Sequence, residues 1–130
     1  MPHVVRPLLL YDGDCRFCRA SARFVARLDG ARQLAFLPMH DERAEPYVLL
    51  VPDSDRFKSF HIIEPEGRTS SRGTGVIAAL MILRSTGLLG RALRALHATW
   101  LMDLLYAGVA RGRGFLGRFV RDAPGPIRWP

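Results

Sequence analysis

Short apolar runs and a segment of helical period alternate along the N-terminal part of the chain. Residues 8–11 form an unbroken apolar run, which is typical of a strand buried in a parallel sheet. Residues 16–28 carry apolar side chains at helical spacing, and residues 34–37 are a second short apolar run that ends at Pro38. A strand, a helix and a strand in close succession predict a βαβ unit, in which the two strands are parallel.

The predicted helix over residues 16–28 has two different faces. The stripe that we expect to face the core is formed by Phe17, Ser21, Phe24, Val25 and Leu28. Another face is basic and is formed by Arg16, Arg19, Arg23 and Arg27. Asp29 and Gly30 follow, and we expect Gly30 to end the helix as a glycine C-cap.

The middle of the chain predicts a hairpin followed by a helix. Residues 41–51 are compatible with a short helix interrupted by Pro46, although residues 47–51 are equally compatible with an extended segment. Residues 59–64 alternate in polarity, and a turn at residues 65–67 leads into residues 68–71, which together predict a β-hairpin. Thr74 is a candidate N-cap for a helix from Gly75 to about Arg84.

Helical period continues beyond Gly87 to about Arg111. The apolar positions recur every three or four residues at Leu89, Leu93, Leu96, Trp100, Leu104 and Ala107, and we expect Trp100 to lie in the core with the leucines. Pro124, Gly125 and Pro126 then predict a non-helical tail.

Length and composition fit a single compact domain. The chain has 130 residues, of which 48% are hydrophobic, enough to bury a core. We expect one domain over residues 1–130, with a core unit over residues 1–86 and a basic helical extension over residues 87–130.

The net charge is strongly positive. The chain has 19 basic and 12 acidic residues, a net charge of +7, and Lys58 is its only lysine. Such a charge suits nucleic acid or an anionic membrane surface, and a solvated arginine-rich surface explains it more simply. Because no nucleic-acid-binding motif is present, we do not expect nucleic acid as a partner. Peripheral contact with an anionic membrane is an expectation for the basic extension.

No segment has the pattern of an export signal or a membrane span. The N-terminal apolar run is interrupted at Asp12, too early for the core of a signal peptide. No stretch approaches the roughly 20 apolar residues that span a bilayer. We therefore expect a cytoplasmic, reducing location, where stable structural disulfides are uncommon.

The candidate chemistry lies in two cysteines that follow the first predicted strand. Cys15 and Cys18 are the only cysteines, and they stand at the start of the predicted helix. A thiolate is stabilised at a helix N-terminus. Because a bond between residues so close together would close almost no loop, chemistry explains the pair better than structure does. We expect Cys15 to be the nucleophile and Cys18 the resolving thiol.

Three neighbouring residues are candidate supporting groups. The cation of Arg16 favours a thiolate at Cys15, which predicts a weaker reductant than thioredoxin. The carboxylates of Asp12 and Asp14 act in the opposite sense, because a negative charge near a thiol raises its pKa. One of them is a candidate proton relay for the thiols. The alternatives are that Asp14 caps the helix or that residues 12–14 only make a tight turn.

Three short motifs together resemble the DCC family of predicted thiol–disulfide oxidoreductases. Residues 11–18, Tyr-Asp-Gly-Asp-Cys-Arg-Phe-Cys, look like its signature, and residues 65–68 look like the turn of its hairpin. Tyr106, Ala110 and Arg113 are similar to its closing Tyr-x-x-x-Ala-x-x-Arg helix, although residues 73–75 are Gly-Thr-Gly where the family has Ser-x-Ala. The resemblance covers residues 8 to about 118.

This resemblance implies an α/β, thioredoxin-like fold: a βαβ unit, a β-hairpin and a helix, with a helical C-terminal extension. It also implies a thiol–disulfide oxidoreductase, or protein-disulfide reductase, that exchanges disulfides with protein or small-thiol substrates. An unidentified reductant would recycle it, and we expect no bound cofactor.

Other functions are compatible with the same residues. Cys15 and Cys18 are half of a zinc site, to be completed by two of the four histidines, none of which is paired at ligand spacing: His3, His40, His61 and His97. Asp12 and Asp14 after a strand are also similar to the motif of aspartyl phosphotransferases, with Lys58 as the only lysine. The third alternative is a basic module that binds an anionic partner and whose cysteines are structural.

Overall fold

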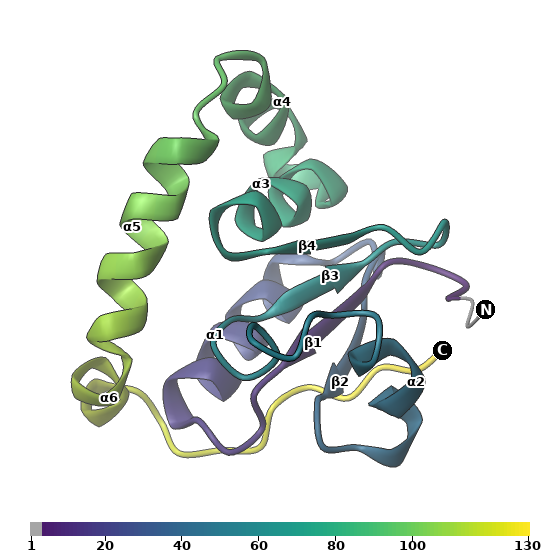
Figure 1. The fold of residues 1–130 in the computed structure, drawn as a ribbon, viewed down its shortest axis with the longest axis vertical. Coiled ribbons are helices and arrows are strands. Elements are labelled where there is room, and N and C mark those ends of the chain that lie inside the picture. Colours follow the sequence, from purple (N-terminus) through teal and green to yellow (C-terminus); the bar gives the residue numbers. More distant parts are fainter. Residues whose placement is uncertain (1–3) are drawn as a thin grey trace.

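The computed structural model describes residues 4–130 and contains one four-stranded mixed sheet (Figure 1). The strand order is β2-β1-β3-β4, with β1 (Leu8–Tyr11) parallel to β2 (Ala35–Pro38) and antiparallel to β3 (His61–Ile63). Strand β4 (Thr69–Ser71) pairs antiparallel with β3. The predicted parallel βαβ unit and the predicted hairpin are both confirmed, with strand ends shifted by at most two residues.

Helices cover both faces of this sheet. The α-helices are α1 (Arg16–Leu28), α2 (Glu45–Val48), α3 (Arg72–Ile82), α4 (Gly87–Ala95), α5 (Thr99–Arg111) and α6 (Arg113–Leu116). Short 3₁₀ turns precede α2 at Glu42–Ala44, precede α4 at Arg84–Thr86 and follow α6 at Gly117–Phe119. This arrangement is the expected α/β, thioredoxin-like fold with a helical C-terminal extension.

Alternate residues of the buried strands belong to two hydrophobic clusters, one on each face of the sheet. Leu8 and Leu10 pack with α2, whereas Leu9 and Tyr11 pack with α1 and α3. Residues on successive positions of a strand point to opposite faces. The unbroken apolar run of β1 therefore reflects a strand covered on both sides.

Helix α3 begins earlier than the sequence predicted. Its N-cap is Ser71, and the prediction of Thr74 as N-cap is wrong. The first N–H groups find acceptors elsewhere in the chain: the Arg72 N–H donates to Ser59 Oγ at 2.8 Å, and the Gly73 N–H donates to Asp103 Oδ1 at 2.9 Å. The acceptors are distant in sequence, which is why local capping rules missed this start.

The helical period beyond Gly87 is divided between two helices. The chain turns at His97, whose φ of 52° is left-handed, so α4 and α5 are separate helices. This turn returns α5 along α3, and a Cβ at Gly73 would overlap the α5 backbone at Asp103. The expectation that Trp100 lies in the core is wrong, because its side chain is 66% exposed.

The non-helical tail is confirmed, and it lies across α1 and along β2 (Figure 1). The Phe36 N–H donates to Arg128 O at 2.9 Å, and the Arg128 N–H donates to Phe36 O at 3.0 Å. The ring of Trp129 packs edge-on against Tyr47, with ring centroids 5.4 Å apart. The tail thereby adds a short antiparallel bridge to β2.

Asp29, rather than Gly30, ends α1. The Asp29 carboxylate is buried and accepts the N–H groups of Gln33 and Leu34, each at 2.8 Å. It also pairs with Arg128 Nη1 of the tail at 2.7 Å. The expected glycine C-cap is therefore wrong: the Asp29 N–H donates to the carbonyls of Val25 and Ala26 at the end of the helix, and Gly30 does not have the positive φ of a glycine cap.

Within residues 4–130, no single helix is long and apolar enough to cross a bilayer. Only α3 taken together with residues Arg84–Ala95 reaches that length and hydropathy, and the two parts are bent by 104°.

Candidate active site

The turn after β1 places Cys15 at the start of α1. The Asp14 N–H donates to Asp12 Oδ1 at 3.0 Å, and the Cys15 N–H donates to the Asp12 carbonyl at 3.3 Å. Gly13 packs so closely on His40 and Pro38 that a Cβ there would overlap the His40 ring. The turn is therefore held from both sides, and it fixes the direction in which α1 leaves the sheet.

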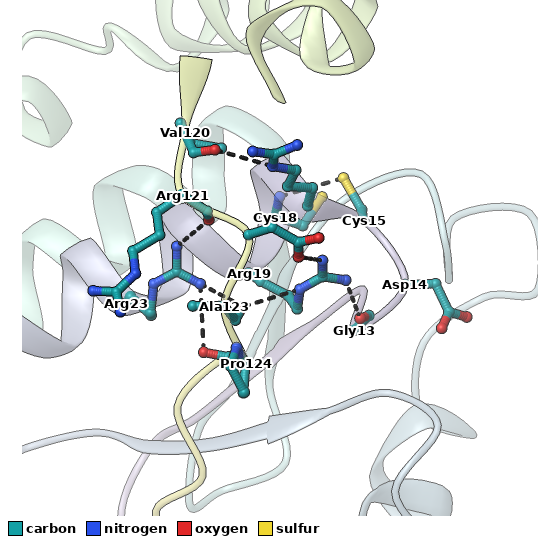
Figure 2. A network of polar contacts seen from close by, with 12 residues as sticks. Gly13, Asp14, Cys15, Cys18, Arg19, Arg23, Val120, Arg121, Ala123 and Pro124 are labelled. Atoms are coloured by element: carbon teal, nitrogen blue, oxygen red, sulfur yellow. Dashed lines mark hydrogen bonds and ion pairs between the residues drawn. The ribbon is translucent and has the colours of Figure 1, made fainter. Parts of the chain in front are cut away.

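Cys15 is the N-cap residue of α1, and both cysteines are unbonded to each other and half-buried. The Cys15 Sγ accepts the N–H of Cys18 at 3.3 Å, so a backbone dipole at the helix N-terminus points at this sulfur (Figure 2). Burial raises the pKa of the Cys18 thiol from 9.0 to about 12, and the adjacent Cys15 side chain raises it as well. The two thiols therefore differ in environment although they are one helical turn apart.

A cation from the C-terminal extension lies beside Cys18. Arg113 Nη1 is 3.7 Å from Cys18 Sγ, and its charge lowers the pKa of that thiol against the effect of burial. Tyr106, from the same closing motif, accepts the N–H of Phe60 at 3.4 Å through its hydroxyl. Tyr106 and Ala110 lie on α5, and Arg113 begins α6. The Tyr-x-x-x-Ala-x-x-Arg spacing was visible in the sequence, but sequence reasoning did not identify Arg113 as a site residue.

Arginines line an open hollow over Cys15. Its volume is about 340 Å³, and its lining is formed by Cys15, Arg16, Phe17, Arg113, Gly114, Gly117 and Arg118. The Arg16 Nε donates to the Val120 carbonyl at 3.0 Å, which holds this side chain against the tail. Cys15 is thus reached through a hollow that carries three arginines.

An apolar cleft lies on the Cys18 side of the pair. It has a volume of about 320 Å³ and is lined by side chains of α1, α3 and α5, with Asp12 and Arg113 as its charged members. The stripe predicted to face the core lines this cleft instead, and within it Phe24 is 58% exposed. Ala22 is the residue of α1 that is fully buried. The predicted core stripe is therefore only partly buried: Val25 packs against the core cluster, whereas Phe24 and Leu28 are exposed.

The two candidate carboxylates occupy different environments. Asp12 accepts the N–H bond of the turn and lines the cleft beside Cys18. Asp14 is exposed, and its carboxylate points away from the cysteines (Figure 2). Since Cys15 is the N-cap, the alternative that Asp14 caps the helix is wrong.

On the basic face of α1, Arg16, Arg19 and Arg23 bind the tail, whereas Arg27 is exposed. Arg19 donates to the carbonyls of Gly13 and Ala123 at 2.8 and 3.2 Å and pairs with Asp122 at 2.7 Å. Arg23 donates to the carbonyls of Arg121 and Ala123 at 2.8 and 2.6 Å (Figure 2). These bonds connect the cysteine turn, α1 and the tail into one network.

Within residues 4–130, His, Cys, Asp and Glu side chains do not form a group of three that could hold a metal ion. His61 is buried, with its ring nitrogens 2.5 Å from Ser71 Oγ and 2.9 Å from the Arg56 carbonyl, and burial lowers its pKa. His3 lies outside the described residues.

Comparison with known families gives one match. A family model described as DCC1-like thiol-disulfide oxidoreductase matches residues 9–119, which is most of the chain. The chain belongs to this family. A search of curated proteins and a search of solved structures each returned no match. Membership of the DCC1-like family agrees with a redox function and with the thioredoxin-like fold.

Proposed function

We propose that this DCC1-like protein exchanges disulfides with protein or small-thiol substrates, with Cys15 as nucleophile and Cys18 as resolving thiol. One observation carries the proposal: Cys15 is the N-cap of α1, and its sulfur accepts the N–H of Cys18 at 3.3 Å. The positive end of the helix dipole stabilises negative charge at this position. Cys15 also lines the open hollow, where a substrate disulfide can reach it.

The reaction balances as a two-electron transfer. The Cys15 thiolate attacks one sulfur of the substrate disulfide, that S–S bond breaks, and one substrate thiolate leaves. Cys18 then loses its proton and attacks the Cys15 sulfur, which forms the Cys15–Cys18 disulfide and releases the second substrate thiol. The substrate is reduced and the protein is oxidised, so a thiol reductant must restore the pair; we place this cycle in the cytoplasm.

The resolving step requires Cys18 to lose its proton, which its raised pKa opposes. Its pKa is raised to about 12, chiefly by burial, and Arg113 at 3.7 Å is the group that lowers it. Asp12 lines the same cleft and is the candidate acceptor for the Cys18 proton. Replacing Asp12 with Asn should slow resolution and change its pH profile, whereas Asp14→Asn should not, because Asp14 points away. Equal profiles for both variants would exclude the relay.

The surroundings of the pair also suggest how a substrate lies. The arginines of the hollow suit acidic residues near the substrate cysteine, and the apolar cleft suits a large apolar side chain. Phe24→Ser should therefore reduce the rate with apolar-flanked peptide disulfides. Leu49→Ser is the matched control, because Leu49 is similarly exposed, 63% against 58% for Phe24, and does not line the cleft.

The deciding experiment is a redox titration in glutathione buffers with mass-shift alkylation, followed by trapping of mixed disulfides. We expect a reversible two-electron couple less negative than about −270 mV, the value for thioredoxin. Cys18→Ser should accumulate a mixed disulfide on Cys15, and Cys15→Ser should accumulate none. Thiols that never pair, or equal exchange by Cys15→Ser, would overturn the proposal.

A further inference from the structure

The outer surface of α4 and α5 is apolar and uncovered. Its side chains are 41% to 81% exposed and comprise Leu88, Leu89, Leu96, Trp100, Leu101, Leu104 and Leu105. We call these residues the outer apolar face. Figure 1 shows α5 along one side of the molecule, with the rest of the fold on its other side. Large apolar side chains left this exposed on two successive helices mark a contact with another body.

The inner side of α5 accounts for its attachment. Asp103 accepts the N–H of Gly73 on α3, Tyr106 accepts the N–H of Phe60 just before β3, and Ala110 lines the cleft. The outer positions Trp100, Leu104 and Arg111 recur on the opposite side at helical spacing. Helix α5 is therefore amphipathic with the usual orientation reversed. Its hydrogen-bonding side chains face the fold, and most of its large apolar side chains face outward.

The charge around this face has one sign. Exposed arginines on or next to α4 and α5 are Arg84, Arg91, Arg94 and Arg111. The acidic residues beyond Gly67 are Asp103 and Asp122. Asp103 accepts the Gly73 N–H, and Asp122 pairs with Arg19, so both carboxylates have partners within the chain.

We propose that the outer apolar face binds the surface of a membrane rich in anionic phospholipids, with the arginines on lipid phosphates and the apolar side chains at the headgroup boundary. Arginine forms paired hydrogen bonds with phosphate oxygens, and a basic helix with an outward apolar face lies in the interfacial plane. A second copy of the chain fits less well, because a symmetric contact would bring arginines against arginines.

The test is flotation of the full chain with vesicles of phosphatidylcholine, with and without about one third phosphatidylserine. The chain carries Cys15→Ser and Cys18→Ser, so the result does not depend on disulfide exchange. We expect binding to the anionic vesicles alone, weakened by salt. Equal binding to both vesicle types, or no binding to either, overturns the proposal.

Two pairs of variants test the face itself. Arg91→Gln with Arg94→Gln should weaken binding roughly thirtyfold, at about 1 kcal/mol for each arginine near an anionic surface. Trp100→Ser with Leu104→Ser should weaken it roughly tenfold or more, and since both side chains are over 60% exposed the fold should not depend on them.

Matched controls lie outside the face. Arg27→Gln and Leu49→Ser remove an exposed arginine and an exposed leucine elsewhere on the molecule, and vesicle binding should stay unchanged. Binding that falls equally in the controls overturns the assignment of the face. Sedimentation velocity tests the alternative that the face binds a second copy of the chain. A dimer that dissociates when Trp100→Ser and Leu104→Ser are introduced together would overturn the membrane proposal and assign the face to that second copy.

Discussion

Helices α1 and α5 both line the apolar cleft beside Cys18, but their outer faces are covered differently. The outer face of α1 carries arginines, and the C-terminal tail lies across it. The outer face of α5 carries leucines and a tryptophan, and these side chains are exposed. The charged face is thus held within the fold, whereas the apolar face is left open.

Hydrogen-bond requirements explain this difference. Residues 120–124 are in no helix or strand, so their carbonyls are free to accept hydrogen bonds from side chains. Arginine has five N–H donors, so Arg16, Arg19 and Arg23 bind the tail through its carbonyls. The outer face of α5 offers few donors for such a segment, because leucines stand between Trp100 and Arg111. It suits a partner that needs few, such as the acyl boundary of a membrane.

The largest effect should come from releasing the tail at its buried anchor. Arg128→Met leaves the Asp29 carboxylate, 1% exposed, without its cation. Breaking a buried pair in this way should lower the free energy of unfolding by about 3 kcal/mol or more. Urea denaturation measures this loss. Arg121→Met is the control, because Arg121 is exposed and contributes its backbone carbonyl, and it should change stability by about 0.5 kcal/mol at most. Equal losses would show that the tail is not anchored at Asp29.

A second variant separates α5 from the core. Gly73→Ala places a methyl group against the α5 backbone at Asp103, and overpacking of this kind costs about 1–3 kcal/mol. Gly108→Ala, on α5 itself, meets open space and should stabilise by about 0.5–1 kcal/mol because alanine favours the helix. Urea denaturation measures both. A neutral Gly73→Ala would mean that α5 is only loosely attached to α3.

Arg113 follows α5 in the chain and lies beside Cys18 of α1, so it connects these two helices at the site. Arg113→Gln removes the charge that lowers the pKa of Cys18, so fewer molecules carry the Cys18 thiolate and the mixed disulfide on Cys15 should live about tenfold longer. Quenched-flow alkylation measures that lifetime. Arg111→Gln removes a neighbouring exposed arginine and should leave the lifetime unchanged. A lifetime unaffected by Arg113→Gln would assign Arg113 to substrate binding or structure.

The smallest effect concerns alkaline pH. Burial raises the pKa of Tyr11 from 10.0 to about 12, as it raises that of Cys18 from 9.0 to about 12. Both groups are more easily deprotonated in the unfolded chain, so their stabilisation is complete below about pH 9 and is lost as the pH rises towards about 12.

Tyr11→Phe isolates the tyrosine contribution. At neutral pH it should cost about 1 kcal/mol, since the Tyr11 hydroxyl no longer donates to the Pro126 carbonyl of the tail at 2.8 Å. Above pH 10 the variant should lose stability less steeply than the original chain, as measured by urea midpoints at successive pH values. An unchanged slope would exclude Tyr11 as the titrating group.

Local patterns were enough to predict the strands, α1 and the hairpin. Residues 8–11 had to be buried on both sides because four apolar residues in succession leave no polar face, and the turn of residues 12–14 had to follow. The position of Cys15 at the N-terminus of α1 follows from that order. The sequence resemblance then led to the family that the comparison confirmed.

The remaining features depend on contacts between residues far apart in the chain. The start of α3 depends on Ser59 and Asp103, the pairing of the buried carboxylate after α1 on Arg128, and the charge beside Cys18 on Arg113. Periodicity shows that a helix has an apolar face and a basic face, but it does not show which face another segment will cover. By itself the sequence determined the order of elements and the place of the thiols, because those follow from short-range backbone preferences. Only the tertiary structure decided that the arginines hold the tail and the leucines stay exposed, because that depends on which segment needs hydrogen-bond donors.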